Sequence, residues 1–205
     1  GRFFDIPPTQ IIPKPVQEPH PPVFAACSKP DSAAAVGKLG LGALNFAGGD
    51  DKFLSQKITN YRAEVAAAEP KLWEKNDHFA CVPASLILPD DRKACVYGFQ
   101  GARFFADALA RYAFFGDRPT GPLDHVHRDA LSEDELRAAI EYRNASDSQL
   151  NMVVGDPVAA RETVQRFHDA GIDELILLMQ TGTTPHELVL ESVRVFGEQV
   201  IPHFS

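Results

Sequence analysis

The sequence contains little of what marks several classes of protein. It has three cysteines among 205 residues, Cys27, Cys81 and Cys95, and none is spaced as a CxxC motif. A disulfide scaffold or a thiolate metal centre is therefore not predicted. Apolar runs fall far short of the roughly 20 residues that span a bilayer, and no secretory signal is visible. We expect a soluble cytoplasmic protein without a membrane partner.

Basic clusters are missing as well. Lys and Arg number 20 against 28 Asp and Glu, for a formal net charge of -8. Because no stripe of cations could neutralise a row of phosphates, nucleic acid is not expected as a partner. Hydrophobic residues make up 44% and charged residues 23% of the chain, which suits an ordinary globular protein of a single domain, residues 1–205.

Apolar runs alternate with amphipathic segments along most of the chain. Residues 7–22 contain seven prolines, so this part is predicted to be an extended connection. We predict strands at 22–27, 41–46, 78–88 and 174–179, and helices at 31–38, 51–68, 90–112, 132–143, 156–170 and 184–200. This alternation predicts an α/β protein with a parallel sheet.

Local signals refine these elements. Ser132 and Glu135 have the spacing of a capping box, and Gly171 suits a left-handed helix end. Pro83 indicates a bulge or an edge position within the third strand. Thr184 is expected to cap the last helix, whose predicted apolar stripe is Val189, Val193, Phe196 and Val200.

Four such strands do not close a barrel. A complete TIM barrel has eight strands and typically about 250 residues. We therefore predict the carboxy-terminal half of a TIM (β/α)8 barrel, strands five to eight, with the other half upstream of Gly1. Residues at about 114–150, including a loop at 114–131, are interpreted as an insertion. A small doubly wound sheet is the alternative.

Several separated motifs support one family in particular. They are Lys14-Pro15-Val16-Gln17-Glu18-Pro19-His20-Pro21-Pro22-Val23, Leu39-Gly40-Leu41-Gly42, Val154-Gly155-Asp156-Pro157, Ala170-Gly171-Ile172-Asp173-Glu174-Leu175, Pro185-His186-Glu187 and Phe196-Gly197-Glu198-Gln199-Val200-Ile201-Pro202. In this order they resemble the bacterial-luciferase-like flavin-dependent monooxygenases, over nearly the whole chain.

The resemblance implies an activity. It points to oxidation of a small organic substrate by reduced flavin mononucleotide (FMN) and molecular oxygen, with a flavin reductase as the source of reduced flavin and a homodimer as the full-length form. The family's proton-handling histidine belongs to the amino-terminal half, so we assign no catalytic residue here. A deazaflavin-dependent oxidoreductase and a non-catalytic flavin-binding relative are the alternatives.

The resemblance also implies a cofactor site where the first strand meets its helix. Ala26, Cys27 and Ser28, with Ser32, are the residues predicted to bind the flavin, Ser28 standing at the family's phosphate-binding serine. Free amides at a helix start attract phosphate, but the charge of Asp31 would oppose it. The alternative is that Ser28 and Asp31 only cap the helix. Cys27 is expected to be a small buried or flavin-facing residue rather than a nucleophile.

Histidines offer no clear metal site. Asp124-His125-Val126-His127 could present two imidazoles on one face, but no cluster of carboxylates or thiols accompanies them. We interpret this segment as a polar loop and predict no metal. His186 is left without a role.

Overall fold

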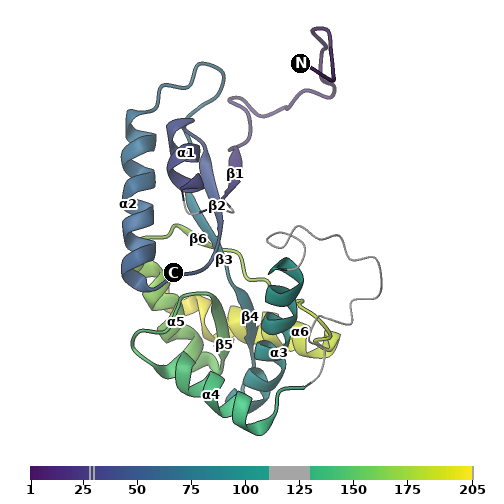
Figure 1. Ribbon diagram of the computed structural model, residues 1–205, viewed down its shortest axis with the longest axis vertical. Helices are drawn as coiled ribbons and strands as arrows, with labels where there is room; N and C mark the ends of the chain where they lie inside the picture. Colours follow the sequence, from purple (N-terminus) through teal and green to yellow (C-terminus); the bar gives the residue numbers. More distant parts are fainter. Residues whose placement is uncertain (28, 30, 111–129, 205) are drawn as a thin grey trace.

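The computed structural model describes residues 1–27, 29, 31–110 and 130–204. Its elements are, in chain order, β1 (Phe24–Cys27), α1 (Ser32–Lys38), β2 (Gly42–Phe46), α2 (Asp51–Ala67), β3 (Phe79–Val82), β4 (Ala84–Ile87), α3 (Asp91–Leu109), α4 (Glu133–Asn144), β5 (Met152–Gly155), α5 (Pro157–Ala170), β6 (Glu174–Leu175), α6 (His186–Gln199) and the 3-10 turn η2 (Ile201–His203). Figure 1 shows the Pro-rich lead, residues 7–22, extending away from the rest of the chain.

Four strands form a parallel sheet in the order β1-β2-β3-β6. The predicted α/β class with parallel strands is thus confirmed. The strands are added in chain order without a reversal, whereas a doubly wound sheet needs a point at which the order reverses. The doubly wound alternative is therefore wrong for the part of the chain that the structure describes.

The third predicted strand changes partners at Pro83. Its first part, β3, lies between β2 and β6, and its second part, β4, pairs with β5 from Ala84↔Met152 to Ile87↔Gly155. Proline has no amide to donate to a ladder, so an interruption at this residue is expected. Strand β5 was not predicted, because we placed a helix start at Asp156 and no strand before it. Short apolar runs such as Met152–Val154 are ambiguous in sequence.

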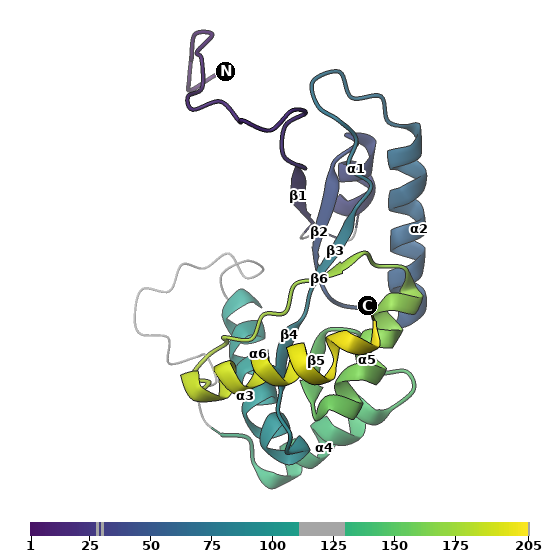
Figure 2. The same cartoon turned by 180° about the vertical axis from the view of Figure 1, so that it is seen from behind.

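Helices α1 and α2 cover one face of the four-stranded sheet (Figures 1 and 2). The core between them and the sheet includes the fully buried side chains of Leu54, Tyr61 and Phe79. The Tyr61 hydroxyl lies 3.0 Å from the carbonyl oxygens of both Leu41 and Asn76. This contact ties α2 to the amino-terminal ends of β2 and β3.

The opposite face of the sheet is only partly covered. Side chains alternate between the two faces of a strand, and Phe24, Phe46 and Ile176 on this face are 38%, 48% and 42% exposed. Partly exposed aromatic and aliphatic side chains of neighbouring strands are typical of a surface that packs against further protein.

Two predicted helix boundaries are confirmed. Ser132 and Glu135 form the capping box, with the Glu135 amide donating to Ser132 Oγ and the Ser132 amide donating to Glu135 Oε2. Gly171 ends α5 in the left-handed region, with a φ of 98°. The predicted loop at 114–131 and the expected helix end at Tyr112 lie largely outside the described residues.

Of two predictions about α6, one is wrong and the other holds in part. Pro185, not Thr184, precedes the helix, and the Thr184 hydroxyl donates to the carbonyl of Thr181 at 2.8 Å. Of the predicted stripe, Val200 is buried and Phe196 packs against the core, whereas Val193 is 55% exposed and the buried face also includes Leu188, Ser192 and Val195. Ser192 is polar but fully buried, so the apolar pattern did not include it. Its hydroxyl accepts the Ile87 amide at 2.8 Å, which a sequence pattern cannot show.

Candidate functional site

The predicted cofactor residues lie at the carboxyl end of β1. Ala26 and Cys27 are the last two residues of this strand, and Ser32 is the first residue of α1. Ser28 lies outside the described residues. Carboxyl ends of parallel strands are where barrels and other α/β folds place their binding sites.

Cys27 is 3% exposed, and its thiol lies 3.6 Å from the carbonyl oxygen of Ala25. Burial raises the pKa of the Cys27 thiol above its ordinary value, so the thiolate is disfavoured. The expectation of a small buried residue, rather than a nucleophile, agrees with this environment.

Ser32 closes the turn that enters α1. Its hydroxyl donates to the Lys29 carbonyl at 2.6 Å and accepts the Lys29 amide at 3.1 Å. Asp31 occupies the N-cap position, but its side chain makes no capping hydrogen bond. The alternative in which the Asp31 side chain caps the helix is therefore wrong.

A hollow of about 350 Å³ opens beside these strand ends. Its lining is apolar and comes from three neighbouring strands, the segment after β6 and helix α3: Ala26, Cys27, Leu44, Phe46, Val82, Phe105 and Leu178. Phe46 and Phe105 contact each other with ring centroids 5.8 Å apart. Two predicted site residues, Ala26 and Cys27, thus share one cavity.

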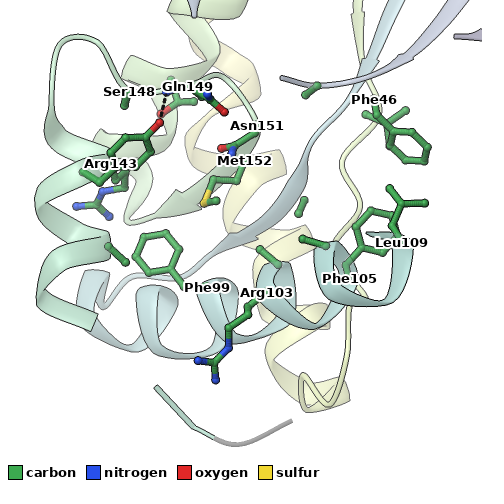
Figure 3. A pocket seen from close by; sticks show the side chains of 18 of the residues that line it. Phe46, Phe99, Arg103, Phe105, Leu109, Arg143, Ser148, Gln149, Asn151 and Met152 are labelled. Carbon is green, nitrogen blue, oxygen red and sulfur yellow. Dashed lines mark hydrogen bonds between the residues drawn. The ribbon is translucent and has the colours of Figure 1, made fainter. Parts of the chain in front are cut away.

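A second pocket of about 430 Å³ adjoins this hollow, because both are lined by Phe46, Val82 and Phe105. It lies between α3, α4 and the segment leading into β5 (Figure 3). Its further lining includes Phe99, Ala102, Leu109, Leu131, Ala139, Tyr142, Gln149, Asn151 and Met152. This pocket could not be predicted from the sequence, since its walls are distant in sequence.

Arginines at the margin of this second pocket are held by carboxylates. Arg143 donates to both carboxylate oxygens of Asp91, at 2.6 and 3.1 Å. Arg166 donates to both oxygens of Asp51, at 2.7 and 3.2 Å. Arg143 holds the pKa of the Asp91 carboxyl below its ordinary value, mainly through these hydrogen bonds.

Lys57 lies on the helix-covered side of the same strand ends. Its ammonium donates to Asn45 Oδ1 at 2.7 Å, and Cys27, Asn45 and Cys81 are register partners across β1, β2 and β3. Burial lowers the pKa of Lys57, and burial raises the pKa of Cys81 to about 12. No sequence pattern marks this lysine.

His186, the remaining candidate within the described residues, lines neither cavity. His186 is exposed at the start of α6, and His125 and His127 lie outside the described residues. Within residues 1–27, 29, 31–110 and 130–204, no group of three or more His, Cys, Asp or Glu could hold a metal ion. No helix in the described part of the chain is long and apolar enough to cross a membrane.

The apolar cavity at the carboxyl ends of these parallel strands lies where α/β folds commonly bind small molecules. The family model of luciferase-like monooxygenases matches residues 1–174, so the chain belongs to that family. No curated protein matches the chain.

Solved structures share the fold at low identity. The monooxygenase RslO1 from Streptomyces bottropensis is 20% identical, with a TM-score of 0.62, over 95% of this chain and 51% of its own. The coenzyme F420-dependent tetrahydromethanopterin reductase from Methanopyrus kandleri is 16% identical, with a TM-score of 0.56, over 90% of this chain and 51% of its own.

A third similar structure is the oxygenating constituent of 3,6-diketocamphane monooxygenase from Pseudomonas putida, in complex with FMN. It is 12% identical, with a TM-score of 0.56, over 93% of this chain and 54% of its own. The chain therefore spans about half the length of these structures.

Proposed function

We propose that this chain supplies the carboxy-terminal half, strands five to eight, of a (β/α)8 barrel in a cytoplasmic flavin-dependent monooxygenase. The enzyme oxidises a small organic substrate with reduced FMN and molecular oxygen. The observation that carries this proposal is the apolar hollow at the carboxyl ends of β1 and β2, in a chain of the luciferase-like family. Active sites of barrel enzymes lie at this end of the strands.

The residues present fit one wall of a flavin site. Ala26 leaves space beside Leu44, its register partner, and the rings of Phe46 and Phe105 provide apolar contact area for a flat tricyclic ring. Ser28 and Ser32, with the amides of the β1–α1 turn, are proposed to bind the phosphate. Bound reduced flavin would supply the electrons for oxygen chemistry, while this wall orients the ring and excludes water.

The partners follow from the same proposal. A separate flavin reductase is proposed to deliver reduced FMN, and the full-length protein is proposed to be a homodimer. The FMN complex of the Pseudomonas putida relative supports this choice of flavin.

A deazaflavin is the second candidate cofactor, because the Methanopyrus kandleri relative depends on coenzyme F420. Both cofactors carry a flat tricyclic ring, and the apolar lining of the described cavity accommodates either one. A non-catalytic flavin-binding protein is the further alternative.

Titration of the full-length protein with FMN and with F420, each followed by fluorescence, distinguishes these candidates. Ala26→Trp should fill the hollow and weaken binding of the cognate cofactor at least tenfold. Ala35→Trp, at an exposed position of α1, is the matched control and should bind as the wild type does. Oxygen uptake with a flavin reductase then separates a monooxygenase from a non-catalytic relative. Tighter binding of F420 than of FMN would overturn the FMN assignment.

A further inference from the structure

The second pocket stands beside the proposed flavin wall and extends beyond it towards α4. It reaches from Phe46 and Phe105, which it shares with the flavin hollow, to Tyr142 and Gln149 at its far end. A molecule bound there would lie next to a ring held in the hollow. This arrangement suits a second reactant.

The walls of the pocket are mostly apolar. Phe99 and Leu109 come from α3, Leu131 and Ala139 from the α4 region, and Met152 from β5. Pockets of roughly 300–1,000 Å³ with apolar walls and a few polar groups are typical sites for small organic ligands. The volume of about 430 Å³ falls within this range.

Three arginines contribute to the lining, yet their charges are compensated. Arg143 and Arg166 are paired with Asp91 and Asp51 as described, and Arg103 forms an ion pair with Glu135 at 3.3 Å. In Figure 3 the guanidinium of Arg103 points away from Met152 and Asn151. Since each cation already faces a carboxylate, the pocket does not select an anionic ligand.

The polar groups gather at one end. Gln149 and Asn151 carry carboxamides there, and the backbone N–H of Gln149 donates to the Tyr142 hydroxyl oxygen at 3.2 Å. Carboxamides both donate and accept hydrogen bonds without net charge. This end can therefore hold a hydroxyl or carbonyl group of a ligand.

We infer that this pocket binds the organic substrate, and that the substrate is a neutral molecule with an apolar body and one hydrogen-bonding end. The inference rests on the proposed function for the neighbouring flavin. The substrate's polar end lies at Asn151 and Gln149, and its apolar body extends along Phe99 and Met152 towards Phe46.

Binding of prodan, a neutral fluorescent ketone with an apolar body, tests the pocket in the full-length protein. Ala139→Phe should fill the pocket and weaken prodan binding at least tenfold. Ala138→Phe is the matched control, because Ala138 is exposed on the same helix and does not line the pocket. Ala102→Phe places the same obstruction on α3, so that a folding defect of one variant does not decide the result. Wild-type prodan affinity in both pocket variants would overturn the inference.

Competition tests the charge of the ligand. Octanol should displace prodan at a concentration at least tenfold below that of octanoate, which has the same chain length. Equal or better displacement by octanoate would show that the arginines form an anion site, contrary to the inference. FMN titration of the same variants separates the two proposals. If FMN fails to bind while the prodan results hold, the flavin proposal fails, and the pocket stands as a site for a neutral apolar ligand but not as the site of a flavin-dependent substrate.

Discussion

Arg143 and Asp91 form a bidentate ion pair that joins α4 to the first turn of α3. Arg143 Nη1 also lies 3.1 Å from Cys95 Sγ, and Asp91 Oδ1 accepts the amide of Asp156 at 3.1 Å. The two side chains are 12% and 35% exposed. Because this pair holds the start of α3, the end of α4 and the start of α5 together, it supports the wall of the second pocket.

Arg143→Met should destabilise the full-length protein. Removal of one partner of a fully buried pair costs about 3–5 kcal/mol, and the partial exposure of Asp91 reduces this to about 1–3 kcal/mol. Urea denaturation measures the change. Arg92→Met is the control, because its partner Glu133 is 73% exposed, and it should change the stability little. Equal effects of the two variants would contradict the structural role of Arg143.

The same pair predicts a dependence on pH. The pKa of Asp91 is lowered in the folded protein, first by its hydrogen bonds with Arg143. The contribution of Asp91 to the free energy of unfolding is therefore complete above the ordinary Asp pKa of about 3.9. It is lost as the pH falls through the lower pKa of Asp91 in the folded protein. The stability difference between wild type and Arg143→Met should be constant from neutral pH to about 5 and should shrink below about 4. If the stability difference between the two proteins persists unchanged at low pH, it comes from packing of the Arg143 side chain and not from the ion pair.

Ser28→Asp should weaken FMN binding. A carboxylate at the proposed phosphate position repels the phosphate dianion. Leu39→Asp adds the same charge at the other end of α1, where the side chain is 51% exposed, and should bind FMN as the wild type does. Titration at modest salt compares them. Unchanged FMN affinity in Ser28→Asp would remove this position from the phosphate site.

Residues 1–205 made alone should be oligomeric or poorly packed and should show no flavin-dependent oxygenase activity. The chain exposes 12833 Å², whereas a compact monomer of its mass exposes roughly 9,500 Å². The Pro-rich lead and the open sheet face both contribute to this excess. The edges at β1 and β6 also leave backbone groups available for pairing. Size-exclusion chromatography, thermal melting and oxygen uptake test this, and a compact, active monomer would contradict it.

Much of the fold could be predicted from local patterns. The apolar runs at 41–46 and 78–88, the turn at Gly171 and the capping box at Ser132 each depend on neighbours within a few residues. The family motifs could be read for the same reason. The predicted flavin residues could be placed at a strand end, although their contact with a phosphate stays a prediction.

Other features depend on contacts between distant residues. The pairing of β4 with β5 and the second pocket join segments far apart in sequence, and the Ser192 hydroxyl accepts the amide of Ile87, 105 residues away. No sequence pattern distinguishes Lys57 either, because its hydrogen bond to Asn45 joins α2 to β2. Thus the sequence by itself determined the order and type of most elements, because hydrogen bonding within helices and turns is local. The tertiary structure decided which faces are covered and where the cavities lie, because burial and side-chain pairing depend on which elements pack together.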